Sequence, residues 1–233
     1  MYDKKLGVVG GMGPAATAYF FELLIKLANA GVDQEHLETY IINRPSIPDR
    51  TAFILGKSQE SPVPPIIEAG RMLVSLGADI LAIPCVTAHF FYDELADGIG
   101  VPVIDMVKET SLHLAARGVK RAGLMAADGT ISGGIFNGAL DARGISAVIP
   151  SVQMQARVMS LIYDNVKANK PSDVDGFYSV VEELMANGAE VIILACTELS
   201  LIKRELSLSD GFVDAMEILA QRSLEACTAP VHP

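Results

Sequence analysis

The sequence has little of several things that would mark other classes of protein. It has three cysteines, four histidines and no tryptophan among 233 residues. The cysteines, at positions 85, 196 and 227, show no metal-ligand spacing, and three thiols give no paired disulfide framework. Basic residues are also scarce, since 18 Lys and Arg stand against 28 Asp and Glu, a net charge of −10. This acidity argues against a nucleic-acid or anionic-membrane partner, because both require a basic surface.

Long hydrophobic runs are missing as well. Half of the residues are apolar, but the longest apolar stretch, residues 80–91, is interrupted by proline, cysteine, threonine and histidine. A membrane-spanning helix needs about 20 apolar residues, so we expect no transmembrane segment. The first five residues lead into a short apolar run that is typical of a strand rather than of a signal peptide. These features predict a cytoplasmic protein with free thiols.

The order of the predicted elements indicates an α/β fold. Short apolar runs at residues 6–9, 39–42 and 80–83 alternate with helical patterns such as residues 15–30, which lie between Pro14 and Gly31. Such alternation is typical of βαβ units and parallel sheets. A chain of this length forms either one large domain or two lobes of about 100 residues each.

Internal repetition favours two lobes. Gly-Ala-Asp-Ile-Leu-Ala-Ile-Pro-Cys at residues 77–85 aligns with Gly-Ala-Glu-Val-Ile-Ile-Leu-Ala-Cys at residues 188–196. Residues 4–10 and 103–105 likewise align with residues 120–126 and 212–214. We therefore predict two pseudo-symmetric α/β lobes, each with a mainly parallel sheet flanked by helices and with the active site between them. The predicted first lobe is residues 1–105 with 212–233, and the second is residues 106–211.

Cys85 and Cys196 fall at the predicted carboxyl ends of matching strands. Ligands of open parallel sheets bind at that edge, and the N-terminus of a following helix stabilises a negative charge. Two facing thiols can remove a proton from one face of a carbon and return one to the other face, which inverts its configuration. The alternative for either cysteine alone is packing in an apolar core, the role that we assign to Cys227.

Four stretches of the sequence resemble the aspartate/glutamate racemase family. They are Gly-Gly-Met-Gly-Pro-Ala-Ala-Thr at residues 10–17, Ile-Pro-Asp-Arg-Thr at 47–51, Pro-Cys-Val-Thr-Ala-His at 84–89 and Cys-Thr-Glu-Leu at 196–199. Each is weak alone, but their order and spacing are specific and cover nearly the whole chain. The resemblance implies a homodimeric racemase that needs no pyridoxal phosphate, metal or other cofactor. It also implies that Cys85 and Cys196 act as two bases on a small anionic amino acid, aspartate or glutamate.

The resemblance implies roles for charged residues near the thiols. Arg50 matches the arginine that binds the side-chain carboxylate of the substrate, and Asp49 is a candidate for setting the charge state of a thiol. Lys167 lies in a helical stretch similar to one with a substrate-binding lysine, and it shares a helix face with Tyr163. The alternatives are a surface pair of Arg50 with Asp49 and a solvated helix face for Lys167.

Further candidates for the site lie in the loops at the predicted strand ends: Met12, Thr87, Thr130, Thr197 and, in a supporting role, Glu198. The glycines on either side of Met12 would let backbone N–H groups approach a ligand. The threonines would supply hydroxyl groups. Thr130 and the nearby Ser132 match a loop of the family that opens the second lobe, which alternatively only turns the chain.

Val86 is the main departure from the family pattern. Most members have asparagine after the first cysteine, and a valine side chain cannot donate a hydrogen bond to a carboxylate. The alternative is therefore a related two-cysteine isomerase or racemase acting on another small carboxylic acid. Ala195, where glycine usually precedes the second cysteine, is a smaller departure. For His89 we favour a structural role over one in orienting the loop.

Two alternatives belong to other classes of protein. The pattern Gly11-x-Gly13-x-x-Ala16 satisfies a loose dinucleotide fingerprint, which would suit a nicotinamide-dependent oxidoreductase. The next predicted strand, however, is followed by Asn43-Arg44 instead of the acidic residue that binds a ribose. A binding protein with two lobes has no need for matched thiols. A pair of one thiolate and one thiol predicts a bell-shaped pH profile of activity.

Overall fold

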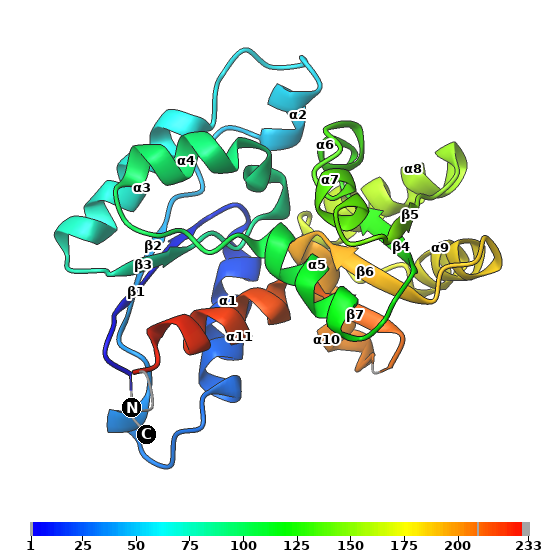
Figure 1. Ribbon diagram of the computed structural model, residues 1–233. Helices are drawn as coiled ribbons and strands as arrows, with labels where there is room; N and C mark the ends of the chain where they lie inside the picture. The colour runs from blue at the N-terminus through cyan, green and yellow to red at the C-terminus, as the bar shows by residue number, and fades with distance from the viewer. Residues whose placement is uncertain (1, 209, 230–233) are drawn as a thin grey trace.

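The computed structural model describes residues 2–208 and 210–229. Two parallel sheets lie side by side (Figure 1), with strand orders β2-β1-β3 and β5-β4-β6-β7. All pairings between these strands are parallel. The predicted α/β fold, with two parallel sheets flanked by helices, is therefore confirmed.

The first sheet contains β1 (Leu6–Gly10), β2 (Thr39–Asn43) and β3 (Ile80–Ala82). Its α-helices are α1 (Pro14–Leu27), α2 (Arg50–Ile54), α3 (Val63–Ser75) and α4 (Tyr92–Ile99). Two 3-10 helices, η1 (Asp33–Glu35) and η2 (Val86–Phe91), join these elements.

The second sheet contains β4 (Arg121–Ala126), β5 (Ser146–Val148), β6 (Val191–Ala195) and β7 (Phe212–Asp214). Its helices are α6 (Asp128–Ser132), α7 (Asn137–Asp141), α8 (Val152–Ser160), the π-helix η3 (Leu161–Val166), α9 (Val174–Ala186) and α10 (Thr197–Leu206). Two more helices, α5 (Met106–Ala116) and α11 (Ala215–Cys227), lie between the sheets.

The two sheets repeat one topology. Val103 pairs in parallel with Leu81 as an isolated bridge, at the place beside β3 that β7 occupies beside β6. Directly after these segments, the side chains of Asp105 and Asp214 accept hydrogen bonds from the first backbone N–H groups of α5 and α11. The alignment of residues 103–105 with 212–214 therefore corresponds to equivalent positions in space.

Strand β7 corrects one boundary of the predicted lobes. We placed residues 212–233 with the first lobe, but Phe212–Asp214 pairs with β6 because this short strand completes the second sheet. Residues 1, 209 and 230–233, which the division also covered, lie outside the described residues. The rest of the division stays a prediction.

Each long strand shows a two-residue alternation between an inner and an outer core. Leu6 and Val8 of β1 and Leu124 of β4 belong to one apolar cluster that extends across both lobes. The neighbouring Val9 and Met125 point the other way, into clusters confined to their own lobes. Because side chains on a strand alternate in direction, each sheet is covered on both faces.

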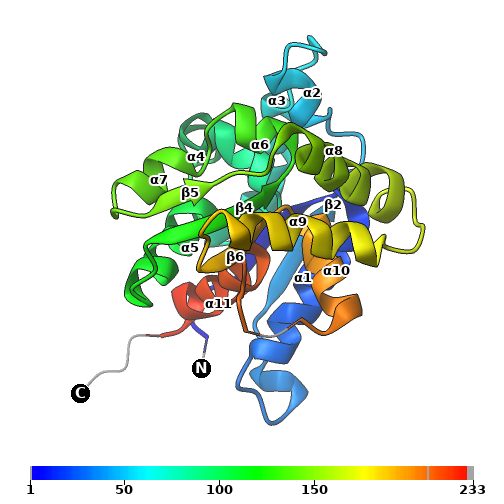
Figure 2. The same ribbon diagram turned by 90° about the vertical axis from the view of Figure 1, so that its right-hand side faces the viewer.

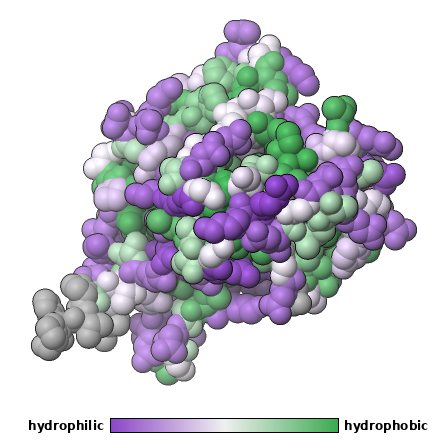
Figure 3. Space-filling model, turned by 45° about the vertical axis from the view of Figure 1, so that its right-hand side comes forward, coloured by the Kyte–Doolittle hydropathy of each residue, from purple (hydrophilic) through white to green (hydrophobic). Residues whose placement is uncertain are grey.

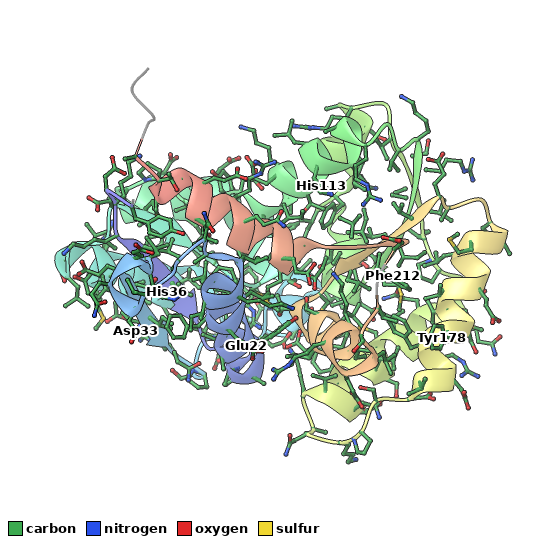
Figure 4. All side chains as sticks on the ribbon, turned by 90° about the horizontal axis from the view of Figure 1, so that it is seen from below. Glu22, Asp33, His36, His113, Tyr178 and Phe212 are labelled. Carbon is green, nitrogen blue, oxygen red and sulfur yellow. The ribbon has the colours of Figure 1, made fainter. Side chains whose placement is uncertain are left out.

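Helices fill the layers on either side of the sheets. In the shared core, α11 packs against both α1 and α5, and Figure 4 shows it between α1 and the helix that carries His113. The outer faces are covered by α3 in the first lobe and by α8 and α9 in the second (Figure 2). The face in Figure 3 is mostly hydrophilic, with hydrophobic residues in patches. Within residues 2–208 and 210–229, none of the helices combines the length and apolar character of a membrane span.

Candidate active site

Both cysteines of the repeat line one small cavity, to which both lobes contribute. The cavity lies where the loops after β1, β3, β4 and β6 meet, which is the ligand-binding edge of parallel sheets. Eight other predicted site residues line it with them: Met12, Asp49, Arg50, Val86, Thr87, Lys167, Thr197 and Glu198. Thr130 stands behind this lining, and its hydroxyl lies 3.2 Å from that of Thr87 in a hydrogen bond across the lobes.

The two cysteines enter the cavity from loops of different shape. Cys196 directly follows the last residue of β6 and precedes the first turn of α10. Cys85 comes later in its loop, because Ile83 and Pro84 separate it from the end of β3, and it precedes the 3-10 helix η2. Both side chains are buried, at 5% exposure for Cys85 and 7% for Cys196.

Arg50 is buried at the start of α2 and held in a fixed orientation. Its guanidinium donates to the backbone carbonyls of Met12 at 3.0 Å, Pro48 at 3.0 Å and Ile47 at 3.4 Å. Its Nε atom has no hydrogen-bond partner among the described residues. Since the side chain is only 7% exposed, the alternative of a surface arginine does not hold.

The charge of Arg50 is associated with the first thiol. Burial lowers the pKa of Arg50, but the negative charges of Cys85 and Asp49 oppose the burial and raise this pKa overall. The Asp49 side chain accepts a hydrogen bond from the backbone N–H of Ala52, which caps α2 and places Arg50 at the first position of the helix. A thiolate at Cys85 would therefore have a cation as its neighbour.

Tyr163 and Lys167 reach the cavity from the π-helix η3 and the residue after it. The Tyr163 hydroxyl donates to Asp49 Oδ2 at 3.1 Å, a contact between the two lobes. Lys167 Nζ lies 4.3 Å from the centre of the Tyr163 ring, in a cation–π contact. Its side chain is 27% exposed and lines the cavity, so Lys167 faces both the cavity and the solvent. A π-helix is frequent at functional sites.

The second thiol has an acidic neighbour. Cys196 Sγ donates to Glu198 Oε2 at 3.0 Å, and Thr197 Oγ1 donates to the same oxygen at 3.4 Å. Burial, together with the negative charge of Glu198, raises the pKa of Cys196 well above its ordinary value. Lys167 Nζ lies 3.9 Å from Glu198 Oε1. Cys196 is therefore held as a neutral thiol, in contrast to the cationic surroundings of Cys85.

His89 is buried and uses both ring nitrogens. Nδ1 lies 3.0 Å from the backbone carbonyl of Cys85, and Nε2 accepts a hydrogen bond from the backbone N–H of Met106 at 3.2 Å. The ring thus ties the loop of Cys85 to the start of α5. This contact fits the structural role that we favoured, and it also orients the loop.

Some cavity residues were missed by the sequence analysis: Thr51, Ala127 and Ile162. Thr51 adjoins Arg50 in the family-like stretch at residues 47–51, and Ala127 follows the segment that aligns with β1. The sequence therefore pointed to the positions of both residues. Ile162 reaches the cavity only through the fold of the second lobe. Cys227 packs in the shared core, as predicted. In the described part of the chain, no group of three or more His, Cys, Asp or Glu side chains is arranged to hold a metal ion.

Comparison with known proteins assigns this chain to a family. A model of the Asp/Glu/hydantoin racemase family matches residues 9–222. The broad specificity amino-acid racemase RacX of Bacillus subtilis is 26% identical over 230 residues, which cover 96% of this chain and 98% of that protein. The chain therefore belongs to the Asp/Glu/hydantoin racemase family, and it is an isomerase of the amino-acid racemase class.

Solved structures agree with this assignment. The aspartate racemase of Picrophilus torridus is 31% identical, with a TM-score of 0.84 and coverage of 96% of this chain and 94% of that one. The glutamate racemase of Francisella tularensis, solved in complex with D-glutamate, is 16% identical, with a TM-score of 0.67 and coverage of 96% and 81%. The second likeness shows a shared fold. Together the matches favour a racemase over the oxidoreductase alternative.

Proposed function

We propose that the protein racemises an acidic amino acid, aspartate or glutamate, by proton transfer between Cys85 and Cys196. One observation carries this proposal: the two thiols line the same cavity from matching loops, yet have neighbours of opposite charge. A proton-transfer pair needs one partner that accepts and one that donates.

In one direction of the reaction, Cys85 is the base and Cys196 is the acid. Cys85, as a thiolate next to Arg50, takes the α-proton from the face of the substrate that it meets. Cys196, a thiol hydrogen-bonded to Glu198, gives a proton to the opposite face. The two thiols exchange roles for the other enantiomer. The α-carbon is thereby inverted without oxidation or reduction.

Arg50 and Lys167 are the proposed partners of the substrate's two carboxylates. Three of the five N–H groups of Arg50 point at backbone carbonyls, which leaves two, including Nε–H, for a ligand. Lys167 lines both this cavity and the open pocket next to it. Two cations also stabilise the negative charge that develops on the carboxylate when the α-proton leaves.

A second candidate is a racemase with a less acidic substrate. Val86 is 2% exposed and lines the cavity together with the apolar Ile162 and Ala127. An apolar wall accommodates an uncharged side chain better than a carboxylate. The relative RacX carries the description of a broad specificity racemase. The second candidate is therefore a related two-cysteine enzyme that acts on another small carboxylic acid.

Hydrogen exchange in heavy water tests both candidates. Metal-free protein without pyridoxal phosphate is incubated with L- and D-aspartate, L- and D-glutamate and an uncharged amino acid such as alanine. We expect the α-hydrogen NMR signal to disappear and the optical rotation to decay for the acidic pair. Decay for alanine alone supports the second candidate. No exchange with any of these amino acids contradicts the proposed function.

The remaining predictions concern the state of the enzyme. Independence of cofactors and a homodimer stay predictions of the family resemblance, and a cytoplasmic location stays a prediction of the sequence pattern. Light scattering of the purified protein measures the oligomeric state directly, and the exchange assay above measures the need for pyridoxal phosphate.

A further inference from the structure

The buried carboxylate of Glu198 has two oxygens that differ in their hydrogen bonding. Its side chain sits in the first turn of α10, and the residue is 4% exposed. Oε2 accepts the hydrogen bonds of Cys196 and Thr197, but Oε1 has no hydrogen-bond partner among the described residues. A buried acceptor without a donor is unfavourable, and more so when it carries charge. Oε1 is therefore suited to accept from a ligand.

The surroundings of Oε1 leave room for that ligand. Glu198 lines both the inner cavity and an adjoining open pocket of about 490 Å³. Its nearest cation, Lys167 Nζ, stands at 3.9 Å, which is beyond hydrogen-bonding distance. On the other side, a Cβ atom at Gly13 would come to 3.3 Å from Oε1. A side chain at Gly13 would therefore crowd this oxygen, which is itself shielded from solvent.

We propose that Glu198 Oε1 binds the α-ammonium group of the substrate and so restricts the site to free α-amino acids. This inference rests on the proposed function, because it uses the position of the α-carbon between the two thiols. Glu198 Oε2 lies 3.0 Å from Cys196 Sγ, so the carboxylate is adjacent to one of the thiols that act on that carbon. The α-nitrogen is one bond from the α-carbon, whereas a side-chain ammonium is several bonds away. The position of Glu198 next to Cys196 therefore favours binding of the α-ammonium group over a side-chain ammonium group.

The charges of the site agree with this assignment. The cavity is lined by two cations, Arg50 and Lys167, and by two carboxylates, Asp49 and Glu198. Both oxygens of Asp49 already accept hydrogen bonds, from the Ala52 N–H and the Tyr163 hydroxyl, so Glu198 Oε1 is the carboxylate oxygen left for a ligand. An acidic amino acid carries two carboxylates and one ammonium, which is the complementary set. A hydroxy acid or a hydantoin has no ammonium group and could offer Oε1 only a neutral O–H or N–H donor, which binds a carboxylate more weakly than a charged donor does. A site that binds a polar group rejects an analogue lacking it more strongly than an apolar pocket rejects a missing methylene.

The test compares L-aspartate with L-malate, which replaces the ammonium by a hydroxyl group. Calorimetric dissociation constants are measured in a Cys85→Ser background, where racemisation does not alter the ligand. We expect aspartate to bind about 10- to 100-fold more tightly than malate, in the range of a charge-assisted hydrogen bond. With Glu198→Gln added, the ratio of the two dissociation constants should fall toward one.

Matched variants separate binding from structural effects. Glu205 lies on the same helix, is exposed and bonds only to Ser172 among the described residues. Glu205→Gln should leave the aspartate-to-malate ratio unchanged. If Glu198→Gln fails to fold, as judged by circular dichroism, Glu198→Asp takes its place and should lower the ratio by withdrawing the carboxylate. A ratio that stays at the level of the background variant overturns the proposal.

The two proposals fail in different ways. If the wild-type protein exchanges no α-hydrogen but the ratio collapses in Glu198→Gln, the racemase mechanism is wrong and the ammonium site stands. If exchange occurs and the ratio is unaffected, Glu198 serves only Cys196 and Lys167. Equal weakening of aspartate and malate also overturns the ammonium site, because it shows a general effect on the cavity.

Discussion

The loops of Cys85 and Cys196 occupy equivalent places in two lobes but differ in backbone course and in the charged residue beside the sulfur. The first passes through Pro84 before its cysteine and continues into a 3-10 helix, whereas the second turns directly from β6 into the ten-residue helix α10. Arg50 is the charged neighbour of Cys85, and Glu198 is that of Cys196. The repeat therefore fixes where the two thiols lie, and later divergence of the two loops fixes their charge environment.

This difference suits chemistry on a carbon with two faces. The pair must share one proton, because neither a pair of thiolates nor a pair of thiols can transfer a proton across the substrate. Loops with different neighbours assign that proton to one of the two sulfurs. Arg50 lies beside one sulfur and Glu198 beside the other, and Glu198 holds Cys196 as the thiol of the pair. The predictions below alter one loop at a time and compare it with the other.

Removal of either thiol should have the largest effect. Cys85→Ala and Cys196→Ala should each lower the rate of racemisation by about 10²- to 10⁴-fold, the usual contribution of a general acid or base. Polarimetry with both enantiomers of aspartate measures the rates. Cys227→Ala is the control, because this thiol packs in the shared core away from the cavity. Full activity of either of the first two variants contradicts the two-thiol mechanism.

The two helix-capping aspartates should differ in their effect on stability. Burial raises the pKa of Asp214 from 3.8 to about 6. The folded state therefore binds a proton more tightly than the unfolded state, so this stabilisation is present below about pH 4 and is lost as the pH rises to 6. The loss is about 3 kcal/mol, at about 1.4 kcal/mol per pKa unit. The free energy of unfolding of Asp214→Asn, measured with urea, should not show this decrease between about pH 4 and 6. That of Asp105→Asn should show it as the wild type does.

Arg50→Lys tests the cation beside Cys85. Lysine keeps the charge but cannot hold three carbonyls and a ligand with one planar group. We expect kcat/KM for aspartate to fall about 10- to 100-fold, the range of a lost charge-assisted hydrogen bond. Arg44→Lys, which changes an arginine paired with Glu68 outside the thiol cavity, should have little effect. Equal losses in both variants would point to a general loss of stability.

Glu198→Gln should move one side of the pH profile. Burial and the charge of Glu198 together raise the pKa of Cys196. The neutral amide removes the second cause, so the pKa should fall and the thiol should lose its proton at lower pH. The alkaline limb of kcat/KM should then shift to lower pH while the acid limb stays in place. An alkaline limb that stays fixed or moves upward would show that Glu198 does not control this thiol.

Val86→Asn should have the smallest effect. Val86 follows Cys85 at the place where the hydroxyl-bearing Thr197 follows Cys196, so the first loop lacks a donor that the second has. An added amide should raise kcat/KM for aspartate about 5- to 10-fold, the value of one hydrogen bond. Val86→Leu, with a side chain of similar shape to asparagine, controls for size. A gain with leucine as well would assign the effect to packing.

Local sequence carries much of the scaffold and of the site. The strands near residues 6, 39 and 80 follow from short apolar runs, and the aligned Gly-Ala-acid segments place both cysteines at one edge. Arg50 and Lys167 were found through motifs of the family. These signals are local or repeated, so they can be read without knowledge of the fold.

Other features depend on contacts between distant parts of the chain. The hydrogen bond from Tyr163 to Asp49 joins residues 114 positions apart. Ile162 enters the cavity because the chain forms a π-helix there, which its apolar pattern does not distinguish from an α-helix. Strand β7 has three residues, and its membership of the second sheet is decided by its partner β6. The predicted boundary at residue 212 was wrong for this reason.

The apolar cluster common to both lobes limits how substrate reaches the thiols. Moving the lobes apart would expose part of this cluster to water, at about 1.5–3 kcal/mol for each large side chain that becomes fully exposed. We therefore expect substrate to enter through the open pocket, where Met12 and Lys167 line both this pocket and the cavity of the two thiols. We expect turnover in turn to depend on small movements of residues at the open pocket rather than on large motions of the lobes.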